Sequence, residues 1–124
     1  MAHNKEKVAV LGASPKSDKY SNKAVRLLLE HEHHVIPIHP AVKTIEGLAV
    51  FNKLTDIHDK VDTLTVYVSE IVSSSLQDEI LKLNPARVVF NPGAENSALQ
   101  KVLEEHGIFT ENACTLVLLK TGQF

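Results

Sequence analysis

The sequence has little that could cross-link the chain or anchor it in a membrane. Its 124 residues include a single cysteine, Cys114, which excludes an intramolecular disulfide and indicates a reducing compartment. The longest apolar runs, such as residues 116–119, are far too short to span a bilayer. The first seven residues are too polar for a signal peptide. We therefore expect a cytoplasmic protein with no membrane as a partner.

Charge of one sign is also scarce. Thirteen lysines and arginines oppose 15 acidic residues, which gives a formal net charge of −2. Nucleic acid is not an expected partner, because its recognition needs a broad basic surface. A phosphate-bearing ligand would have to be held by local backbone amides and a few basic side chains. With 44% hydrophobic residues the chain can bury one core, and we expect residues 1–124 to form a single domain.

Short β-branched runs alternate with longer amphipathic stretches along the chain. The expected strands are residues 7–11, 35–38, 64–68, 87–90 and 108–109. A helix with Ser21 or Asn22 as its N-cap should follow the first strand. Residues 115–119 favour a short helix capped by Asn112 over a further strand. This alternation predicts an α/β fold, a doubly wound, mainly parallel five-stranded Rossmann-like sheet with helices on both faces and strand order 3-2-1-4-5.

In such sheets, ligands bind in the loops at the carboxyl ends of the strands. The loop after the first strand begins Gly12-Ala13-Ser14, where a glycine lets the backbone approach a ligand and the next helix directs its amides the same way. Only Gly12 of the dinucleotide fingerprint G-x-G-x-x-G is present. A phosphate site and a plain connection are therefore equal alternatives at this loop.

The loop after the second strand discriminates between ligands. NAD-binding domains place an acidic residue there to bind the ribose hydroxyls. Here the position holds His39 and Pro40, followed by Lys43, and no carboxylate appears until Glu46. These basic residues suit a ribose that carries a phosphate, as in NADP or coenzyme A. The alternative is that Lys43 is an ordinary solvated lysine.

Other candidate features carry weaker signals. Residues 91–96 follow a strand and could face a ligand, but a capped turn explains them equally well. His31, His33 and His34 lie at a helix end without the spacing of metal ligands, so no metal is expected. Cys114 has no accompanying base and is expected to be an inert thiol. No catalytic residues are assigned.

Taken together, several segments resemble the CoA-binding domain family, small proteins similar to the N-terminal domain of the succinyl-CoA synthetase alpha subunit. The resemblance runs in order through nearly the whole chain, and its ordered combination is more specific than any single piece. The segments are VLGASP at 10–15, SNK at 21–23, VIPIHP at 35–40, GLAVF at 47–51, VYVS at 66–69, VFNPGA at 89–94 and ENAC at 111–114.

The resemblance implies that the cofactor is coenzyme A or an acyl-CoA. It implies contacts with the diphosphate by Gly12, Ala13, Ser14 and Pro15, supported by Ser21 and Asn22; with the phosphorylated ribose by His39, Pro40 and Lys43; with the adenine nucleotide by Tyr67, Val68 and Ser69; with the pantetheine by Asn91, Pro92 and Gly93; and with the thiol end by Cys114.

Two departures from the ligase limit what the resemblance implies. The loop after the second strand is poorer in glycine, and none of the seven histidines matches the histidine that the ligase phosphorylates in its second domain. We therefore expect a CoA-binding module that acts as a stand-alone carrier, sensor or accessory subunit, without independent catalysis. The alternatives are an NADP-dependent reductase or regulatory nucleotide-binding domain, and a ligase half that needs a partner chain. A homodimer is also compatible with the sequence.

Overall fold

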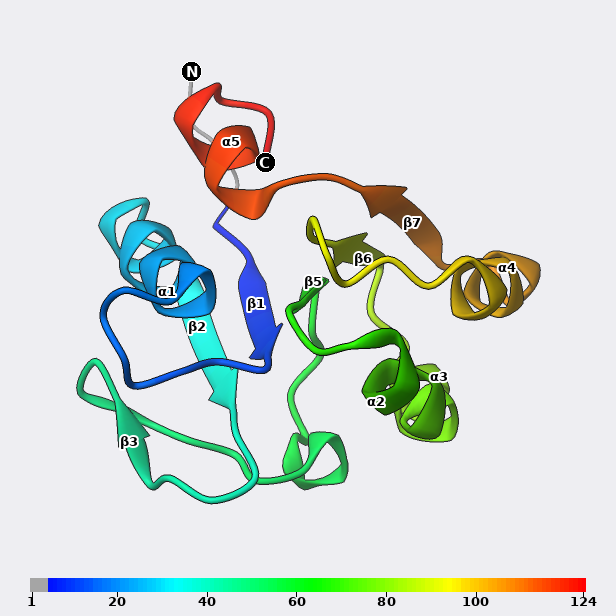
Figure 1. Ribbon diagram of the computed structural model, residues 1–124, viewed down its shortest axis with the longest axis horizontal. Helices are drawn as coiled ribbons and strands as arrows, with labels where there is room; N and C mark the ends of the chain where they lie inside the picture. The colour runs from blue at the N-terminus through cyan, green and yellow to red at the C-terminus, as the bar shows by residue number, and fades with distance from the viewer. Residues whose placement is uncertain (1–4) are drawn as a thin grey trace.

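A computed structural model describes residues 5–124, which form one five-stranded parallel sheet with helices on both faces (Figure 1). The sheet has the order β2-β1-β5-β6-β7, and every neighbouring pair is parallel. Its strands are β1 (Lys7–Leu11), β2 (His34–Ile38), β5 (Thr63–Val66), β6 (Arg87–Phe90) and β7 (Phe109–Asn112). The predicted fold class, a doubly wound Rossmann-like α/β sheet, is confirmed.

The remaining elements connect these strands. The helices are α1 (Tyr20–Glu30), α2 (Glu70–Ser75), α3 (Gln77–Leu83), α4 (Ser97–Glu105) and α5 (Thr115–Lys120), with a 3-10 turn η1 (Leu54–Asp56). A small antiparallel hairpin of β3 (Thr44–Ile45) and β4 (Leu48–Ala49) follows β2. The helix expected at residues 115–119 is confirmed as α5, although its N-cap is Cys114 and Asn112 ends β7.

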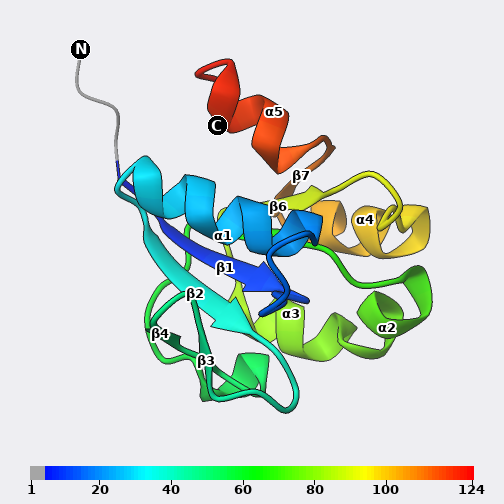
Figure 2. The ribbon, with the colours of Figure 1, turned by 60° about the vertical axis from the view of Figure 1, so that its left-hand side comes forward.

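Two hydrophobic clusters form the core, one on each face of the sheet. Val8 and Val10 of β1 pack with residues of α1 and α5, whereas Ala9 and Leu11 pack with residues of α3 and α4. This alternation follows from the two-residue period of a strand. Figure 2 shows α1 on one side of β1 and β2, with α2 and α3 on the other. Strands covered on both faces explain why the runs in the sequence are continuously apolar.

The predicted strand order 3-2-1-4-5 was wrong. In chain order the five strands lie 2-1-3-4-5, because β5 pairs with β1 on the side opposite β2. On the other side of β2, the single bridge from Ile38 to Phe51 is the only strand pairing formed by residues 5–124. The His34 amide donates to the Glu6 carbonyl beside β1, and the His39 amide donates to the Phe51 carbonyl on the other side of β2. Because successive amides of a strand point to opposite sides, Pro37 lies on the side of β2 that faces away from β1. Proline has no N–H there, which leaves this edge short of a donor for a full ladder.

Candidate functional site

The carboxyl ends of the strands meet at one edge of the sheet, as parallel pairing requires. Leu11 is in register with Ile38 on one side and with Val66 on the other. A cleft of about 550 Å³ lies at this edge. It is lined by Leu11, Gly12, Ile38, Pro40, Asn52, Lys53, Leu54, Thr55, Val68, Val72, Leu76 and Glu79. Most of these side chains are apolar, with lysine, glutamate and amide groups among them.

The sequence predicted only part of this cleft. Gly12, Pro40 and Val68 belong to the expected loops and line it. Residues 52–55, Leu76 and Glu79 were missed, because the segment around η1 has no periodic pattern that would place it there. Leu76 lies between α2 and α3, where it is partly buried, packs against the core and lines the cleft.

Gly12 is required by the packing of the fold itself. It has a φ of +88°, and a Cβ added there would lie 2.9 Å from Cγ1 of Val68 and 3.2 Å from the carbonyl carbon of Tyr67. The amides of Gly12 and Ala13 both donate to the Ile38 carbonyl, at 3.2 and 3.1 Å. These two amides therefore bind β2, and the glycine serves the close approach of the loop to the end of β5.

The start of α1 is the clearest anion-favouring feature of this edge. Ser21 and Asn22 do not cap the helix as predicted; they lie in its first turn with buried side chains. The N-cap residue is Lys19, which makes no side-chain capping bond, and no acidic residue lies in the first turn. The first amides of a helix have no intrahelical acceptor and favour a negative charge. This helix start is therefore open to an anion.

Asn22 and Arg26 hold the loop before α1 in place. The Asn22 amide donates to the Ser14 carbonyl at 2.8 Å and accepts a bond from Arg26 Nε, also at 2.8 Å. Arg26 in turn donates from Nη2 to the Ser17 carbonyl at 2.8 Å. The loop is thus fixed by side chains of the helix that it precedes.

The second loop contributes one free cation. His39 Nδ1 accepts bonds from the amides of Ala41 and Val42, at 3.0 and 3.2 Å, which leaves Nε2 as the ring's donor. Lys43 is exposed, and within residues 5–124 its amino group forms no ion pair. His39 thus organises the loop, and Lys43 carries its available positive charge.

Glu46 is a residue that the sequence reasoning missed. It lies in the turn of the β3–β4 hairpin, which Figure 1 places beneath the loop from β1 to α1. Its Oε2 accepts a hydrogen bond from Asn22 Nδ2 at 3.1 Å. The sequence has no carboxylate directly after the second strand. The hairpin instead brings the Glu46 carboxylate to Asn22, which also holds the loop before α1.

A polar cluster lies beneath the end of β5. The Tyr67 hydroxyl is buried near Thr65, Thr115 and Cys114, and it has no hydrogen-bond partner among the described residues. Burial raises the pKa of Tyr67 to about 12, and the hydroxyl of Thr115 opposes this in part. Ser69, the third residue predicted here, caps α2 by accepting from the Val72 amide at 3.4 Å.

Asn91 joins three elements rather than facing the cleft. Its Nδ2 donates to Thr65 Oγ1 and to the Val66 carbonyl, at 2.7 and 2.9 Å, and its Oδ1 accepts from the Thr115 amide at 2.8 Å. Residues 91–96 form the capped turn that the sequence allowed as an alternative, with Asn96 capping α4. Pro92 and Gly93 are exposed beyond it, and Cys114 is half-buried at the start of α5.

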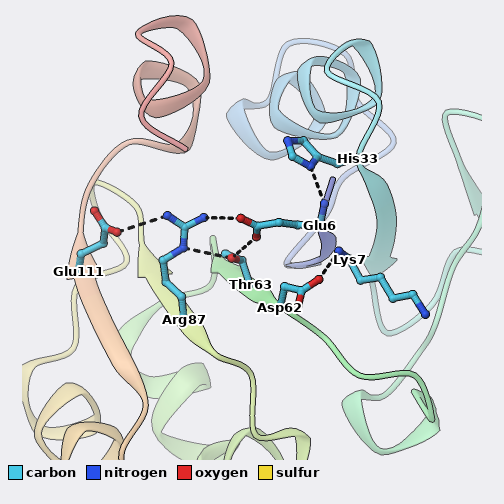
Figure 3. A network of polar contacts seen from close by, with 7 residues as sticks. All are labelled: Glu6, Lys7, His33, Asp62, Thr63, Arg87 and Glu111. Atoms are coloured by element: carbon cyan, nitrogen blue, oxygen red, sulfur yellow. Dashed lines mark hydrogen bonds and ion pairs between the residues drawn. The ribbon is translucent and has the colours of Figure 1, made fainter. Parts of the chain in front are cut away.

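The opposite end of the sheet holds a network of charged side chains centred on Arg87 (Figure 3). His33 lies there, with its Nδ1 accepting from the Glu6 amide at 3.0 Å. Among residues 5–124, no group of three or more histidine, cysteine or acidic side chains is arranged to hold a metal ion. Nor does any helix in that range have the length and apolarity needed to cross a membrane.

Comparison with known proteins agrees with this geometry. The model of the CoA binding domain family matches residues 6–120. A solved uncharacterized protein is 37% identical with a TM-score of 0.93, and the match covers 98% of this chain and 100% of that one. A hypothetical protein from Pyrococcus horikoshii OT3 is 26% identical with a TM-score of 0.87, over 94% of this chain and 83% of that one.

A larger enzyme contains a similar unit. Acetyl-coenzyme A synthetase 1 of Ca. Korarchaeum cryptofilum, solved with phosphate and ADP, is 26% identical with a TM-score of 0.74. The match covers 89% of this chain and only 26% of the synthetase. The chain is thus similar both to proteins over most or all of their length and to about a quarter of a synthetase.

Proposed function

The chain belongs to the CoA-binding domain family, and from that premise we propose that it binds coenzyme A or an acyl-CoA as a single domain. The ligand would occupy the carboxyl ends of β1, β2 and β5. The observation that carries the proposal is the cleft of about 550 Å³ between the β1–α1 loop, the loop after β2 and α2. This is the position where doubly wound sheets bind nucleotides.

The cleft and the loops beside it offer suitable groups for the adenine ring, the diphosphate and the ribose phosphate of the ligand. The apolar cleft wall of Val68, Val72 and Leu76 suits the adenine ring. The uncapped start of α1 suits the diphosphate, because helix amides and the helix dipole favour an anion. Lys43, exposed and without an ion pair among the described residues, suits the phosphate of the ribose.

The pantetheine arm would then run along the same edge toward α5. Pro92 and Gly93 are exposed on that path, and Cys114 lies half-buried at its far end. Ser14 and Pro15 would flank the diphosphate from the loop. Asn91 would act indirectly by holding β5, β6 and α5 together, because its amide is already engaged with Thr65, Val66 and Thr115.

A second candidate is an accessory subunit that supplies the CoA site to a catalytic partner. It is favoured by the similarity to about a quarter of an acetyl-coenzyme A synthetase. In that case the residues that react would come from the partner chain, and this chain would bind and position the cofactor. Coenzyme A binding is common to both candidates, so it is tested first.

Calorimetric titration with coenzyme A, dephospho-coenzyme A, NADP and NAD tests the proposal. We expect coenzyme A to bind most tightly, and we expect dephospho-coenzyme A to bind roughly 10-fold more weakly, since it lacks the phosphate assigned to Lys43. Lys43→Ala should abolish that difference, whereas Lys101→Ala, an exposed lysine on α4, should leave it unchanged. Tighter binding of NADP, or no binding of coenzyme A, would contradict the proposal.

A further inference from the structure

The β3–β4 hairpin is closed by a two-residue loop whose two residues both have positive φ, as the favoured type I′ connections do. Glu46 and Gly47 both have positive φ, at +50° and +76°. A glycine adopts this backbone freely, whereas a glutamate does so at some cost. The turn directs the Glu46 carboxylate to Asn22 of α1, with Oε2 3.1 Å from Nδ2. A residue 24 positions along the chain thereby places a negative charge at the start of α1.

This carboxylate lies where the fold otherwise favours a ligand anion. No acidic residue lies in the first turn of α1, and no side chain caps it. Asn22 is fully buried, and its two Nδ2 protons are used by the Ser14 carbonyl and by Glu46. Within the described part of the chain Glu46 pairs with no cation. Its hydrogen-bonded partner is the neutral side-chain amide of Asn22.

The same hairpin joins Glu46 to Lys43. The Lys43 carbonyl accepts a bond from the Val50 amide at 3.0 Å, which closes the base of the hairpin. Glu46 is three residues further on, at its tip. One short element therefore presents an anion to the first loop and a cation beside the second.

From these observations we infer that Glu46 is an internal competitor for the ligand's phosphate at the start of α1. This inference rests on the proposed function, because it concerns the same site. A ligand phosphate at the first turn would repel the carboxylate, so binding requires that Glu46 leave Asn22. Glu46 thereby keeps the affinity for an anionic ligand lower than the loops alone would give.

The test is Glu46→Gln, which keeps a side chain that can accept from Asn22 and removes the charge. We expect coenzyme A to bind roughly 5- to 20-fold more tightly to this variant at low salt, with the gain shrinking as salt screens the repulsion. Dephospho-coenzyme A should gain by the same factor, because the repulsion acts on the diphosphate. Glu30→Gln, at the far end of α1, is the matched control and should change neither affinity.

The possible outcomes separate this inference from the proposed function. If wild type binds coenzyme A and Glu46→Gln binds it equally or more weakly, the inference is overturned while the proposed function stands. Weaker binding would mean that the carboxylate accepts hydrogen bonds from the ligand. If neither protein binds, both are overturned. Thermal unfolding of each variant confirms that the comparison is made between folded proteins.

Discussion

The two ends of the parallel sheet differ in how their polar and charged groups are arranged. At the amino ends of the strands, Arg87 of β6 pairs with Glu111 of β7 and with Glu6, which precedes β1 (Figure 3). Thr63 of β5 accepts a hydrogen bond from Arg87 and donates one to Glu6. At the carboxyl ends, a helix start has no cap, a lysine has no ion pair among the described residues, and a tyrosine hydroxyl has no partner in that range. The first end pairs its charged side chains with one another, although Arg87 Nη2 has no hydrogen-bond partner among the described residues. The second end leaves the start of a helix and a lysine without a charged partner among those residues.

We call the amino ends of the strands the closed end and their carboxyl ends the open end. Arg87 is the centre of the charged network at the closed end. It donates from Nε to Thr63 Oγ1 at 3.1 Å and lies 3.5 Å from Glu6 and 3.6 Å from Glu111. Its guanidinium carbon also lies 4.4 Å from the centre of the Phe124 ring. Since the side chain is only 15% exposed, these pairs are partly shielded from water. The comparison therefore predicts that changes at this end alter stability and leave ligand binding intact.

The largest effect is expected at the open end, from Gly12→Ala. A methyl group would meet Val68 and Tyr67 at a positive φ, so we expect a loss of about 3 kcal/mol in the free energy of unfolding and a loss of coenzyme A binding. Gly107→Ala is the matched control, since its φ is +83° with open space around it, and it should cost only about 1 kcal/mol. Equal losses in urea unfolding would contradict the packing role of Gly12.

Arg87→Met should lower the free energy of unfolding by about 2 kcal/mol. The change leaves the Glu6 and Glu111 carboxylates without their cation in a partly buried site. Coenzyme A affinity, measured by titration of the folded variant, should stay within about 2-fold of wild type, which is about 0.4 kcal/mol. Lys101→Met controls for the loss of a positive charge. A large loss of affinity would show that the two ends are not independent.

Tyr67→Phe tests the unpartnered hydroxyl of the open end. Since this hydroxyl has no partner within residues 5–124, removing it should change stability by less than about 0.5 kcal/mol. Its pKa of about 12 lies above the ordinary value of 10, so the unfolded chain loses this proton before the folded one does. The free energy of unfolding is therefore unaffected by Tyr67 ionisation below pH 10 and falls as pH rises from 10 through 12. Absorbance titration of wild type against Tyr67→Phe should assign a tyrosine transition near pH 12 to Tyr67. A Tyr67 transition at the ordinary value of 10 would contradict the burial.

The smallest effect is expected from His33 at the closed end. Burial lowers the pKa of His33, opposed by Glu6 and assisted by Lys5, His31 and Arg87. The neutral ring accepts from the Glu6 amide, so its contribution to stability is present above the unfolded pKa of 6.5 and is lost as pH falls through the lower folded value. His33→Gln, whose carbonyl can accept the same bond, should lose less stability between pH 7 and pH 5. Identical losses would contradict this assignment.

The fold class was predictable because buried parallel strands leave a direct trace in the sequence. The runs at residues 7–11 and 87–90 became β1 and β6 with those bounds. The strand order was not predictable from these runs. It depends on which side of β1 receives β5, and that is fixed by pairing between strands far apart in the sequence.

The candidate site was predictable where it follows from the carboxyl ends of strands. That rule found the loops at Gly12, Lys43 and Val68. It could not find Glu46, because a hairpin turn brings that carboxylate to Asn22 from 24 residues away. It also could not show that the amides of Gly12 and Ala13 serve β2, since their acceptor is a carbonyl of another strand.

We propose that coenzyme A binds at the carboxyl ends of the strands and does not bind at their amino ends. The most direct measurement is a titration of isotope-labelled protein with coenzyme A, followed by the backbone amide signals in two-dimensional NMR spectra. We predict saturable shifts at Ser14, at Tyr20 to Asn22 and around Lys43, with Lys7, Thr63 and Arg87 unmoved. Shifts centred on Arg87, or no saturable shifts at all, would contradict the account.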